Sequence, residues 1–394
     1  MTNDKDIILH VEHLTKMFGR NKTTARELLE NGRSKEEILK RTGVTVAVDD
    51  ISFDVERGKI FTLIGLSGSG KSTVVRCLNK LHPATSGKIF FEGRDIEEFS
   101  KQELLEFRRS KMSMVFQSFG LMSHRDVLSN VAFGLEIRGV KKAEREEKAM
   151  EMINMVGLSG WERKSIDNLS GGMRQRVGIA RALTNDPDIL LMDEPFSALD
   201  PLVRHDMQFE LLSIQEKLNK TVVFITHDIN EAFKLGNTVA IMRDGRIIQI
   251  DTPEGMSSNP ADDYVRDFID SADKTQIYSV RNIMQTPSSL IHARDGANNA
   301  LKQMRDNGLS SVYVVEEKMA LVGILTLDQA LKVRAGEITF QDALIRDLPT
   351  TTIDTQISDL IPVAAETNFP IAVVDDKNRL IGIVTKAAVL ASLV

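Results

Sequence analysis

The chain has 394 residues, a length that favours two or three domains with substantial cores. Its 50 basic and 56 acidic residues give a net charge of −6, which argues against a dedicated nucleic-acid-binding protein because such proteins are usually basic. The single cysteine, Cys77, excludes a disulfide framework and a cysteine-built metal site.

The N-terminal stretch 1–6 is polar, and no apolar signal sequence follows it. No apolar run approaches the ~20 residues that a membrane-spanning helix needs. We therefore expect a soluble protein at the cytoplasmic face of the membrane, attached to it through partners. Residues 7–11 and 15–19 are expected to form the first strand.

An insert at 20–43 is expected to form a helical hairpin, with a first helix that ends at Gly32 and a second that ends at Gly43. A capping box between Ser34 and Glu37 would begin the second helix. The insert has seven basic and four acidic residues, so it is either a solvated surface hairpin or a patch that contacts anionic lipid headgroups. Its expected exposed cations are Arg26, Arg33, Lys35, Lys40 and Arg41.

Residues 44 to about 250 are expected to form an α/β domain. Two β-rich stretches come first, and strands and helices then alternate, as in a mainly parallel sheet with crossover helices. A helix at 263–274 is expected to lead into a polar linker. The predicted strands are 44–55, 59–64, 112–116, 189–193 and 221–226, and the predicted helices are 71–80, 141–156 and 204–218.

An internal repeat follows the linker. VVEEKMALVGILT at 314–326 aligns without a gap with VVDDKNRLIGIVT at 373–385, and seven of the thirteen positions are identical. Each copy lies in a β–α–β–β–α pattern that is too short to bury its own faces well, so the two copies are expected to pair. The predicted domains are 1–275, 277–336 and 337–394.

A phosphate-binding loop is predicted at 65–73, where GLSGSGKST matches G-x-x-x-x-G-K-[ST] between an expected strand and an expected helix. Glycines let the backbone amides of such a loop turn toward phosphate oxygens. Lys71 would reach the β- and γ-phosphates of ATP, Ser72 would bind Mg²⁺, and Thr73 would assist at the α-phosphate. The candidate nucleotide-binding residues of the loop are Gly65, Leu66, Ser67, Gly68, Ser69, Gly70, Lys71, Ser72 and Thr73.

Two further motifs point to phosphate chemistry. The apolar strand at 189–193 ends in acids, of which Asp193 fits a Mg²⁺ ligand and Glu194 fits the carboxylate that polarises the attacking water. LSGGMRQR at 169–176 combines a serine, free backbone amides and a helix N-terminus, which together form an anion site.

These motifs, with Gln117 in VFQSF, SALD at 197–200 and THD at 226–228, occur in the order found in ATP-binding cassette (ABC) proteins. From residue 7 to about 250 the chain resembles that family. The resemblance implies a P-loop ABC ATPase domain with a mainly parallel sheet, an antiparallel β subdomain and a helical subdomain. It also implies a homodimer, in which Ser170, Gly171 and Gly172 of one subunit contact the ATP held by the other.

The resemblance assigns four more roles. Gln117 would contact Mg²⁺ and the attacking water, His227 would contact the γ-phosphate, and Asp200 would cross the dimer interface. Phe18 would stack on adenine. Position 173 departs from the common LSGGQ because Met173 cannot form the hydrogen bonds of glutamine, so part of the contact to the partner's nucleotide would be lost or moved.

The cationic insert, the run at 112–130 and the repeat together resemble the ATPase of glycine betaine/proline-type osmoprotectant importers, and the repeat resembles a tandem of α+β CBS domains. The resemblance implies uptake of quaternary ammonium osmolytes such as glycine betaine, proline betaine, carnitine or choline. Two copies would bind two membrane permease subunits, and an extracytoplasmic binding protein would deliver the solute.

The CBS copies depart from the pattern by which many CBS domains grip the ribose of adenine nucleotides. The acid stands one residue early at Asp328, and the second copy lacks it. A cyclic dinucleotide between the copies, or sensing without a ligand, therefore both stay open.

Three alternatives remain beside an osmolyte importer. An amino-acid or methionine-type importer ATPase would carry a different C-terminal domain. A soluble cassette protein acting on ribosomes or DNA usually holds two cassettes or a long coiled coil. A nucleotide-sensing switch without catalysis would not need the intact Glu194 and His227.

Overall fold

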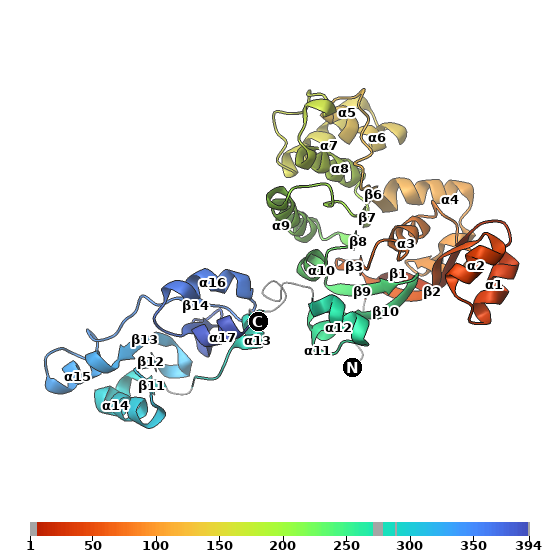
Figure 1. Ribbon diagram of the computed structural model, residues 1–394. Coiled ribbons are helices and arrows are strands. Elements are labelled where there is room, and N and C mark those ends of the chain that lie inside the picture. Colours follow the sequence, from red (N-terminus) through yellow and green to blue (C-terminus); the bar gives the residue numbers. More distant parts are fainter. Residues whose placement is uncertain (1–5, 271–278, 288–289, 393–394) are drawn as a thin grey trace. The chain divides into compact units, whose positions relative to one another are not determined.

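The computed structural model describes residues 6–270, 279–287 and 290–392 (Figure 1). Contacts within the chain divide it into two compact units, Met1–Ala272 and Asp273–Val394. In these described ranges no helix is both long and apolar enough to cross a membrane. The predicted helix at 263–274 is described as far as Asp270, and the remainder of that prediction lies outside the described residues.

A six-stranded sheet forms the centre of the first unit, with the strand order β10-β9-β3-β8-β7-β6. Neighbouring strands from β9 to β6 are parallel, and only β10 pairs antiparallel, at one edge. Strands β3, β7 and β8 are buried over their whole length, which explains their unbroken apolar sequences. The strands are β3 (Ile60–Ile64), β6 (Met112–Val115), β7 (Ile189–Asp193), β8 (Thr221–Thr226), β9 (Thr238–Arg243) and β10 (Arg246–Asp251).

A second sheet is antiparallel and has the order β2-β1-β4-β5. Its long strands β1 and β2 pair along most of their length, and their buried faces pack against Phe61 and Leu63 of the central sheet. The predicted antiparallel β subdomain beside a mainly parallel sheet is therefore confirmed. The strands are β1 (Ile7–Phe18), β2 (Thr45–Glu56), β4 (Ser86–Phe91) and β5 (Arg94–Asp95).

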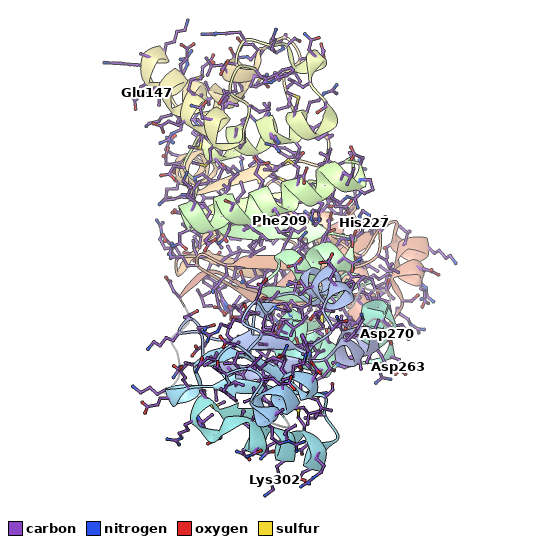
Figure 2. All side chains as sticks on the ribbon, turned by 90° about the vertical axis from the view of Figure 1, so that its left-hand side faces the viewer. Glu147, Phe209, His227, Asp263, Asp270 and Lys302 are labelled. Atoms are coloured by element: carbon purple, nitrogen blue, oxygen red, sulfur yellow. The ribbon has the colours of Figure 1, made fainter. Side chains whose placement is uncertain are left out.

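The helical subdomain predicted from the family resemblance gathers α5 to α8 (Figure 1). Its core contains the fully buried Val131, Ile153 and Val177. The outer face of α7 is charged, and Glu147 points away from the subdomain into solvent (Figure 2). The helices of this unit beyond the insert are α3 (Lys71–Leu78), α4 (Lys101–Glu106), α5 (Val127–Val131), α6 (Phe133–Ile137), α7 (Lys142–Met155), α8 (Gly171–Leu183), α9 (Pro201–Leu218), α10 (Ile229–Leu235), α11 (Pro253–Ser258) and α12 (Asp263–Asp270).

The insert forms the predicted helical hairpin, with α1 at Lys22–Glu30 and α2 at Lys35–Thr42. Ala25 and Ile38 are fully buried and pack in one cluster with Met17 of β1 and Val46 of β2. The hairpin is therefore anchored on the antiparallel sheet, and its charged side chains lie on the opposite face.

Two details of the hairpin differ from the prediction. Only half of the capping box forms: Ser34 Oγ accepts a hydrogen bond from the Glu37 amide at 3.2 Å, but the Glu37 carboxylate pairs with Arg41. Lys35, which was expected to be exposed, is partly buried against the turn at Gly245. A Cβ added to Gly245 would lie 2.2 Å from Lys35 Nζ. Burial lowers the pKa of Lys35.

The second unit contains the predicted repeat. Each copy has the order β–α–β–β–α and a three-stranded sheet. Side chains of both copies share one buried cluster, which confirms that the copies pair: Tyr313, Val315, Ile324, Ala372, Leu380 and Ile383. The first copy consists of β11 (Leu290–His292), α14 (Gly296–Asn307), β12 (Ser311–Val315), β13 (Leu321–Thr326) and α15 (Leu327–Ala335), and the second of β14 (Thr350–Thr351), α16 (Ile357–Glu366), β15 (Ile371–Val374), β16 (Leu380–Val384) and α17 (Lys386–Ala391).

The two copies exchange their leading segments. Helix α13 (Val280–Ile283), which precedes the first copy, packs into the core of the second, and Gln285 exchanges two backbone hydrogen bonds of 2.9 Å with Ile383. Conversely, the segment that ends at Ile345 packs into the core of the first copy, and Ile345 exchanges two backbone hydrogen bonds of 2.9 Å with Ile324. Each core is therefore completed by chain that lies beyond its own copy.

Candidate functional site

The phosphate-binding loop lies between β3 and α3, at the carboxyl edge of the central sheet. Gly65 and Gly70 have φ values of 156° and 102°, and a Cβ added to them would lie 2.1 Å and 2.4 Å from the backbone oxygens of Met242 and Ala47. Only glycine fits such a backbone and such close approaches. The Ser69 carbonyl accepts a hydrogen bond of 3.0 Å from the amide of residue 245, which holds the loop against the β9–β10 turn.

Lys71 begins α3 and is 4 % exposed. Its Nζ donates to the carbonyls of Gly65 at 2.7 Å and Leu66 at 3.1 Å. Burial lowers the pKa of Lys71, and the nearby carboxylates of Glu194 and Asp193 act in the opposite direction. The ammonium group is thus held inside the loop, where it can face a phosphate.

Asp193 ends β7 and is 3 % exposed. Its Oδ1 accepts a hydrogen bond of 2.7 Å from Ser72 Oγ, and its Oδ2 lies 3.4 Å from a guanidinium nitrogen of Arg76. A hydroxyl beside a carboxylate offers the oxygen ligands that Mg²⁺ prefers, so these residues fit the ion. Arg76 was not predicted to take part in this site, although it lies four residues after Ser72 and therefore on the same face of α3.

Glu194, Gln117 and His227 converge from the loops after β7, β6 and β8. Glu194 Oε2 lies 3.2 Å from Gln117 Nε2 and 3.2 Å from His227 Nδ1. The Glu194 backbone has a φ of 46°, an uncommon value for a residue with a side chain, and its amide donates to the Ile225 carbonyl at 3.1 Å. The structure therefore brings the three predicted catalytic residues together around one carboxylate.

Ser197 was not predicted to take part in this group. Its Oγ lies 3.4 Å from Gln117 Nε2 and donates to the Glu194 carbonyl at 3.0 Å. The signal in the sequence is its position three residues after Glu194, where a serine hydroxyl can close a turn back onto the preceding carbonyl.

The signature residues lie at the start of α8. Ser170 is the N-cap, and its Oγ accepts a hydrogen bond of 3.3 Å from the Met173 amide. Ser170 and Gly171 are exposed, whereas Gly172 is buried. Among the described residues, no hydrogen bond or ion pair joins Ser170 to the phosphate-binding loop of its own chain. The exposed cap is thus open to a partner.

Met173 and Gln175 both point inward. Met173 is partly buried and packs against the core of the helical subdomain. Gln175 is fully buried, and its amide oxygen and nitrogen have no hydrogen-bond partner in the described chain. Gln175 therefore cannot replace the hydrogen bonds that a glutamine at position 173 would make.

Asp200 is the N-cap of α9, where it accepts a hydrogen bond of 3.1 Å from the Val203 amide. With Pro201 in the first turn, it starts the helix three residues before the predicted position. Leu202 in the same turn is 81 % exposed. An acid and a large apolar side chain are therefore both presented on the surface here.

Phe18 ends β1 and is 38 % exposed. The ring of His82 meets it edge-on at 5.3 Å between centroids, and Lys16 Nζ lies 4.8 Å from its centroid. The insert at 20–43 does not detach Phe18 from the sheet, because it still pairs with Thr45 of β2. The ring is accessible for stacking.

In the CBS unit, Asp328 and two threonines make local contacts. Thr326 and Thr385 cap α15 and α17 by accepting from backbone amides at 3.3 Å and 3.1 Å. Asp328 pairs with Lys332 of its own helix at 2.7 Å. These contacts give the acid a partner on its own helix.

A groove of about 360 Å³ lies between the central sheet and the helical subdomain. Phe116, Phe133 and Ile137 supply much of its apolar lining, and Arg181 of α8 lies beside them. Arg181 donates to the carbonyls of Phe119, at 2.9 Å, and of the next residue. Hydrogen bonds from Arg181 thus connect the groove to the loop that carries Gln117.

Comparison with known proteins places this arrangement in a family. A family model described as ABC transporter matches residues 48–197, and one described as CBS domain matches 280–336 and 340–394. The glycine betaine/carnitine transport ATP-binding protein GbuA of Listeria monocytogenes serotype 1/2a (strain 10403S) is 49% identical over 386 residues, which cover 98% of this chain and 97% of that protein. The chain belongs to the ATP-binding subunits of ABC transporters.

Further relatives of this ABC ATPase subunit support the same family assignment. The glycine betaine/proline betaine transport system ATP-binding protein ProV of Escherichia coli (strain K12) is 44% identical over 98% of both chains. The ATP-binding cassette MJ0796, solved as a dimer in a post-hydrolysis state with ADP and Pi, matches with a TM-score of 0.53 and 29% identity over 62% of this chain and 98% of that one. The predicted ABC ATPase fold and the binding and hydrolysis of ATP are confirmed by this membership.

Proposed function

We propose that this ABC ATPase subunit powers the uptake of a quaternary ammonium osmolyte, with glycine betaine as the first candidate. The observation that supports this proposal is the match to relatives named for glycine betaine transport. They match nearly the whole chain, including the CBS copies, at 44% to 49% identity. An amino-acid or methionine-type importer is not favoured, since relatives that match 87% to 98% of the chain are named for betaines or carnitine.

In the proposed reaction, Glu194 polarises a water molecule that attacks the γ-phosphate of ATP. Gln117 and His227 orient the Glu194 carboxylate, because both contact its Oε2 at 3.2 Å. Lys71 neutralises phosphate charge from inside the loop, and Phe18 stacks on the adenine. Mg²⁺, when bound, would supply charge stabilisation between the phosphates, held by Ser72, Asp193 and Gln117.

Two copies would form the working unit, with Ser170, Gly171, Gly172 and Asp200 of each copy completing the ATP site of the other. The exposed caps of α8 and α9 support this arrangement. We further propose that a permease subunit docks in the groove beside Phe116 and Phe133, which would hold the chain on the cytoplasmic face of the membrane. An extracytoplasmic binding protein would deliver the solute to the permease.

We assign catalysis to residues 1–275 and regulation to 277–394, with a cyclic dinucleotide at the CBS pair as the first ligand to test. The regulatory pair would bias the closed and open states of the ATPase dimer. The transported solute would not contact this chain.

The proposed substrate is tested by reconstituting the subunit with its permease and binding protein in liposomes. ATP-driven uptake of labelled glycine betaine should exceed uptake of methionine or proline, and Lys71→Ala should remove it because the phosphate-binding cation is lost. ATPase stimulation by methionine or another amino acid, without stimulation by betaine, would instead support the alternative importer.

The cationic hairpin is proposed to set a salt threshold by docking on anionic lipid. Neutralising Arg26, Arg33, Lys40 and Arg41 to Gln should remove that threshold in vesicles with anionic lipid, because exposed charges interact only within a Debye length of about 8 Å at physiological salt. Lys35 is left in place since it packs against the Gly245 turn.

The measurement is ATP-driven uptake against internal salt. A matched control neutralises four exposed cations elsewhere, which should leave the threshold unchanged: Lys142, Lys148, Lys302 and Arg305. An unchanged threshold in the hairpin variant would show that the hairpin is a solvated surface only.

A further inference from the structure

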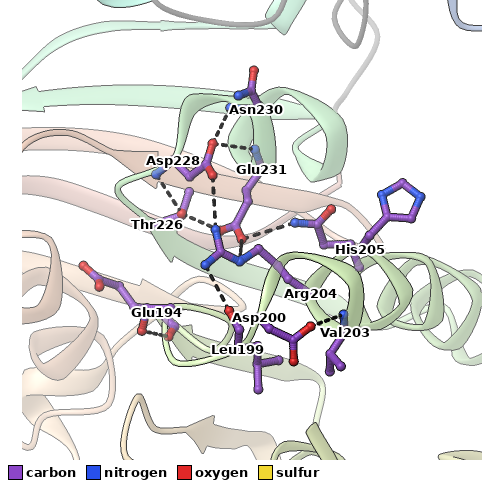
Figure 3. Close-up of polar contacts among 12 residues, drawn as sticks. Glu194, Leu199, Asp200, Val203, Arg204, His205, Thr226, Asp228, Asn230 and Glu231 are labelled. Atoms are coloured by element: carbon purple, nitrogen blue, oxygen red, sulfur yellow. Dashed lines mark hydrogen bonds and ion pairs between the residues drawn. The ribbon is translucent and has the colours of Figure 1, made fainter. Parts of the chain in front are cut away.

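Arg204 lies in the first turn of α9, four residues after Asp200 (Figure 3). One guanidinium nitrogen donates to the Leu199 carbonyl at 3.2 Å. The other two face acids: Nη1 lies 3.6 Å from Asp228 Oδ2, and Nε lies 3.7 Å from Glu231 Oε1. A single side chain thus spans from the loop before α9 to the loop and helix that follow β8.

Glu231 and Asp228 are both linked to Thr226, the residue before His227. Glu231 is 6 % exposed, and its Oε2 accepts a hydrogen bond of 2.6 Å from Thr226 Oγ1. Thr226 Oγ1 in turn accepts from the Asp228 amide at 3.0 Å. His227 is the residue between Thr226 and Asp228, so any shift of these groups shifts the base of its side chain.

A buried carboxylate such as Glu231 is stable only with partners that offset its lost hydration. Burial raises the pKa of Glu231, and Arg204 acts against that rise. Gln208, one turn further along α9 than Arg204, donates to Glu231 Oε1 at 3.2 Å. Helix α9 therefore contacts Glu231 from two positions on one face, Arg204 and Gln208. These contacts connect the start of α9 to the loop that carries His227.

We propose that Arg204 is a positioning residue that couples the SALD segment at 197–200 to His227. Movement of Asp200 against the second subunit would pass through the Leu199 carbonyl and Arg204 to Asp228 and Glu231. Contact between the two subunits would then set where His227 meets Glu194. This inference rests on the proposed roles of Asp200, His227 and Glu194.

The test is Arg204→Met in the full chain, assembled with its permease. The kcat for ATP hydrolysis should fall on the order of tenfold to a hundredfold, while the KM for ATP stays within about twofold, because the geometry of the reacting groups changes and the nucleotide contacts do not. Arg204→Lys should recover only part of kcat, since an ammonium group lacks the fork that reaches a carbonyl and two acids at once.

Arg57→Met is the matched control. Arg57 also joins two acids, Asp6 at 3.0 Å and Glu92 at 2.6 Å, but it lies at the antiparallel sheet, away from the site. Its kcat should equal that of the unaltered chain. An Arg204→Met variant whose kcat matches this control, or whose KM rises while kcat is kept, would overturn the inference.

Loss of Arg204 also leaves the buried Glu231 carboxylate without its cation, which lowers stability. The double variant Arg204→Met with Glu231→Gln removes that charge, so its melting temperature should return while its kcat stays low. Recovery of kcat together with stability would show that Arg204 is merely structural. Normal turnover of Glu194→Gln would contradict the proposed reaction itself, whereas an inactive Glu194→Gln beside a fully active Arg204→Met contradicts only this inference.

Discussion

Glu194→Gln should bind ATP but hydrolyse it more slowly by a factor on the order of 10² to 10⁴, because an amide cannot act as the general base. The shape of the side chain is kept, so Gln117 and His227, each 3.2 Å from the Glu194 carboxylate, lose little of their packing. Lys71 and the phosphate-binding loop are untouched. The variant should therefore accumulate as a closed dimer with ATP bound.

Three measurements check this result: steady-state ATPase rate, equilibrium binding of a fluorescent ATP analogue, and oligomeric state with and without ATP. Glu97→Gln serves as a control in the same domain, since Glu97 pairs with Lys80 at 3.0 Å and belongs to no proposed site. Turnover of Glu194→Gln close to that of the unaltered chain would remove Glu194 from the role of base.

Ser170→Arg should abolish hydrolysis and leave ATP binding to the same chain largely intact. Ser170 is an exposed N-cap, so the larger side chain fits without disturbing a core, and the lost cap costs only about 1 kcal/mol of stability. The bulky cation would instead occupy the surface that we propose contacts the partner's ATP. Ser100→Arg, which removes the capping serine of α4, controls for the loss of a cap and should stay active.

Mixing two inactive variants separates action in trans from action within one chain. A dimer of one Ser170→Arg chain and one Lys71→Ala chain has one site with both changes and one site with neither, if Ser170 acts on the partner's nucleotide. Part of the activity should then return on mixing. If Ser170 served its own chain's site, both sites would be damaged and mixing would restore nothing.

Contiguous motifs predicted most of the site. GLSGSGKST defines its own loop, and an apolar strand that ends in Asp193 and Glu194 places both acids at the sheet edge. The role of Gln117 came from resemblance to a family, because nothing in its immediate neighbours marks it. Its contact with Glu194 spans 77 residues of sequence, and local patterns do not encode such pairings.

The fold was predictable where periodicity or a repeat was strong. The helical hairpin, the buried parallel strands and the paired CBS copies all left such patterns. The contacts of Lys35 and Arg204 could not be predicted, since the residues that surround each of them are distant in sequence. Gln175 is polar and yet fully buried, and only the packing of α8 explains this burial.

The exchanged leading segments of the CBS unit set an order for its folding. The segment at Gln285 must wait for Ile383, which is synthesised 98 residues later, because the two exchange backbone hydrogen bonds. The first copy, although translated earlier, gains its last core residues only when the chain near Ile345 has emerged from the ribosome. Such distant contacts slow folding. The CBS pair should therefore form late and as one cooperative event, after the ATPase domain has already left the ribosome.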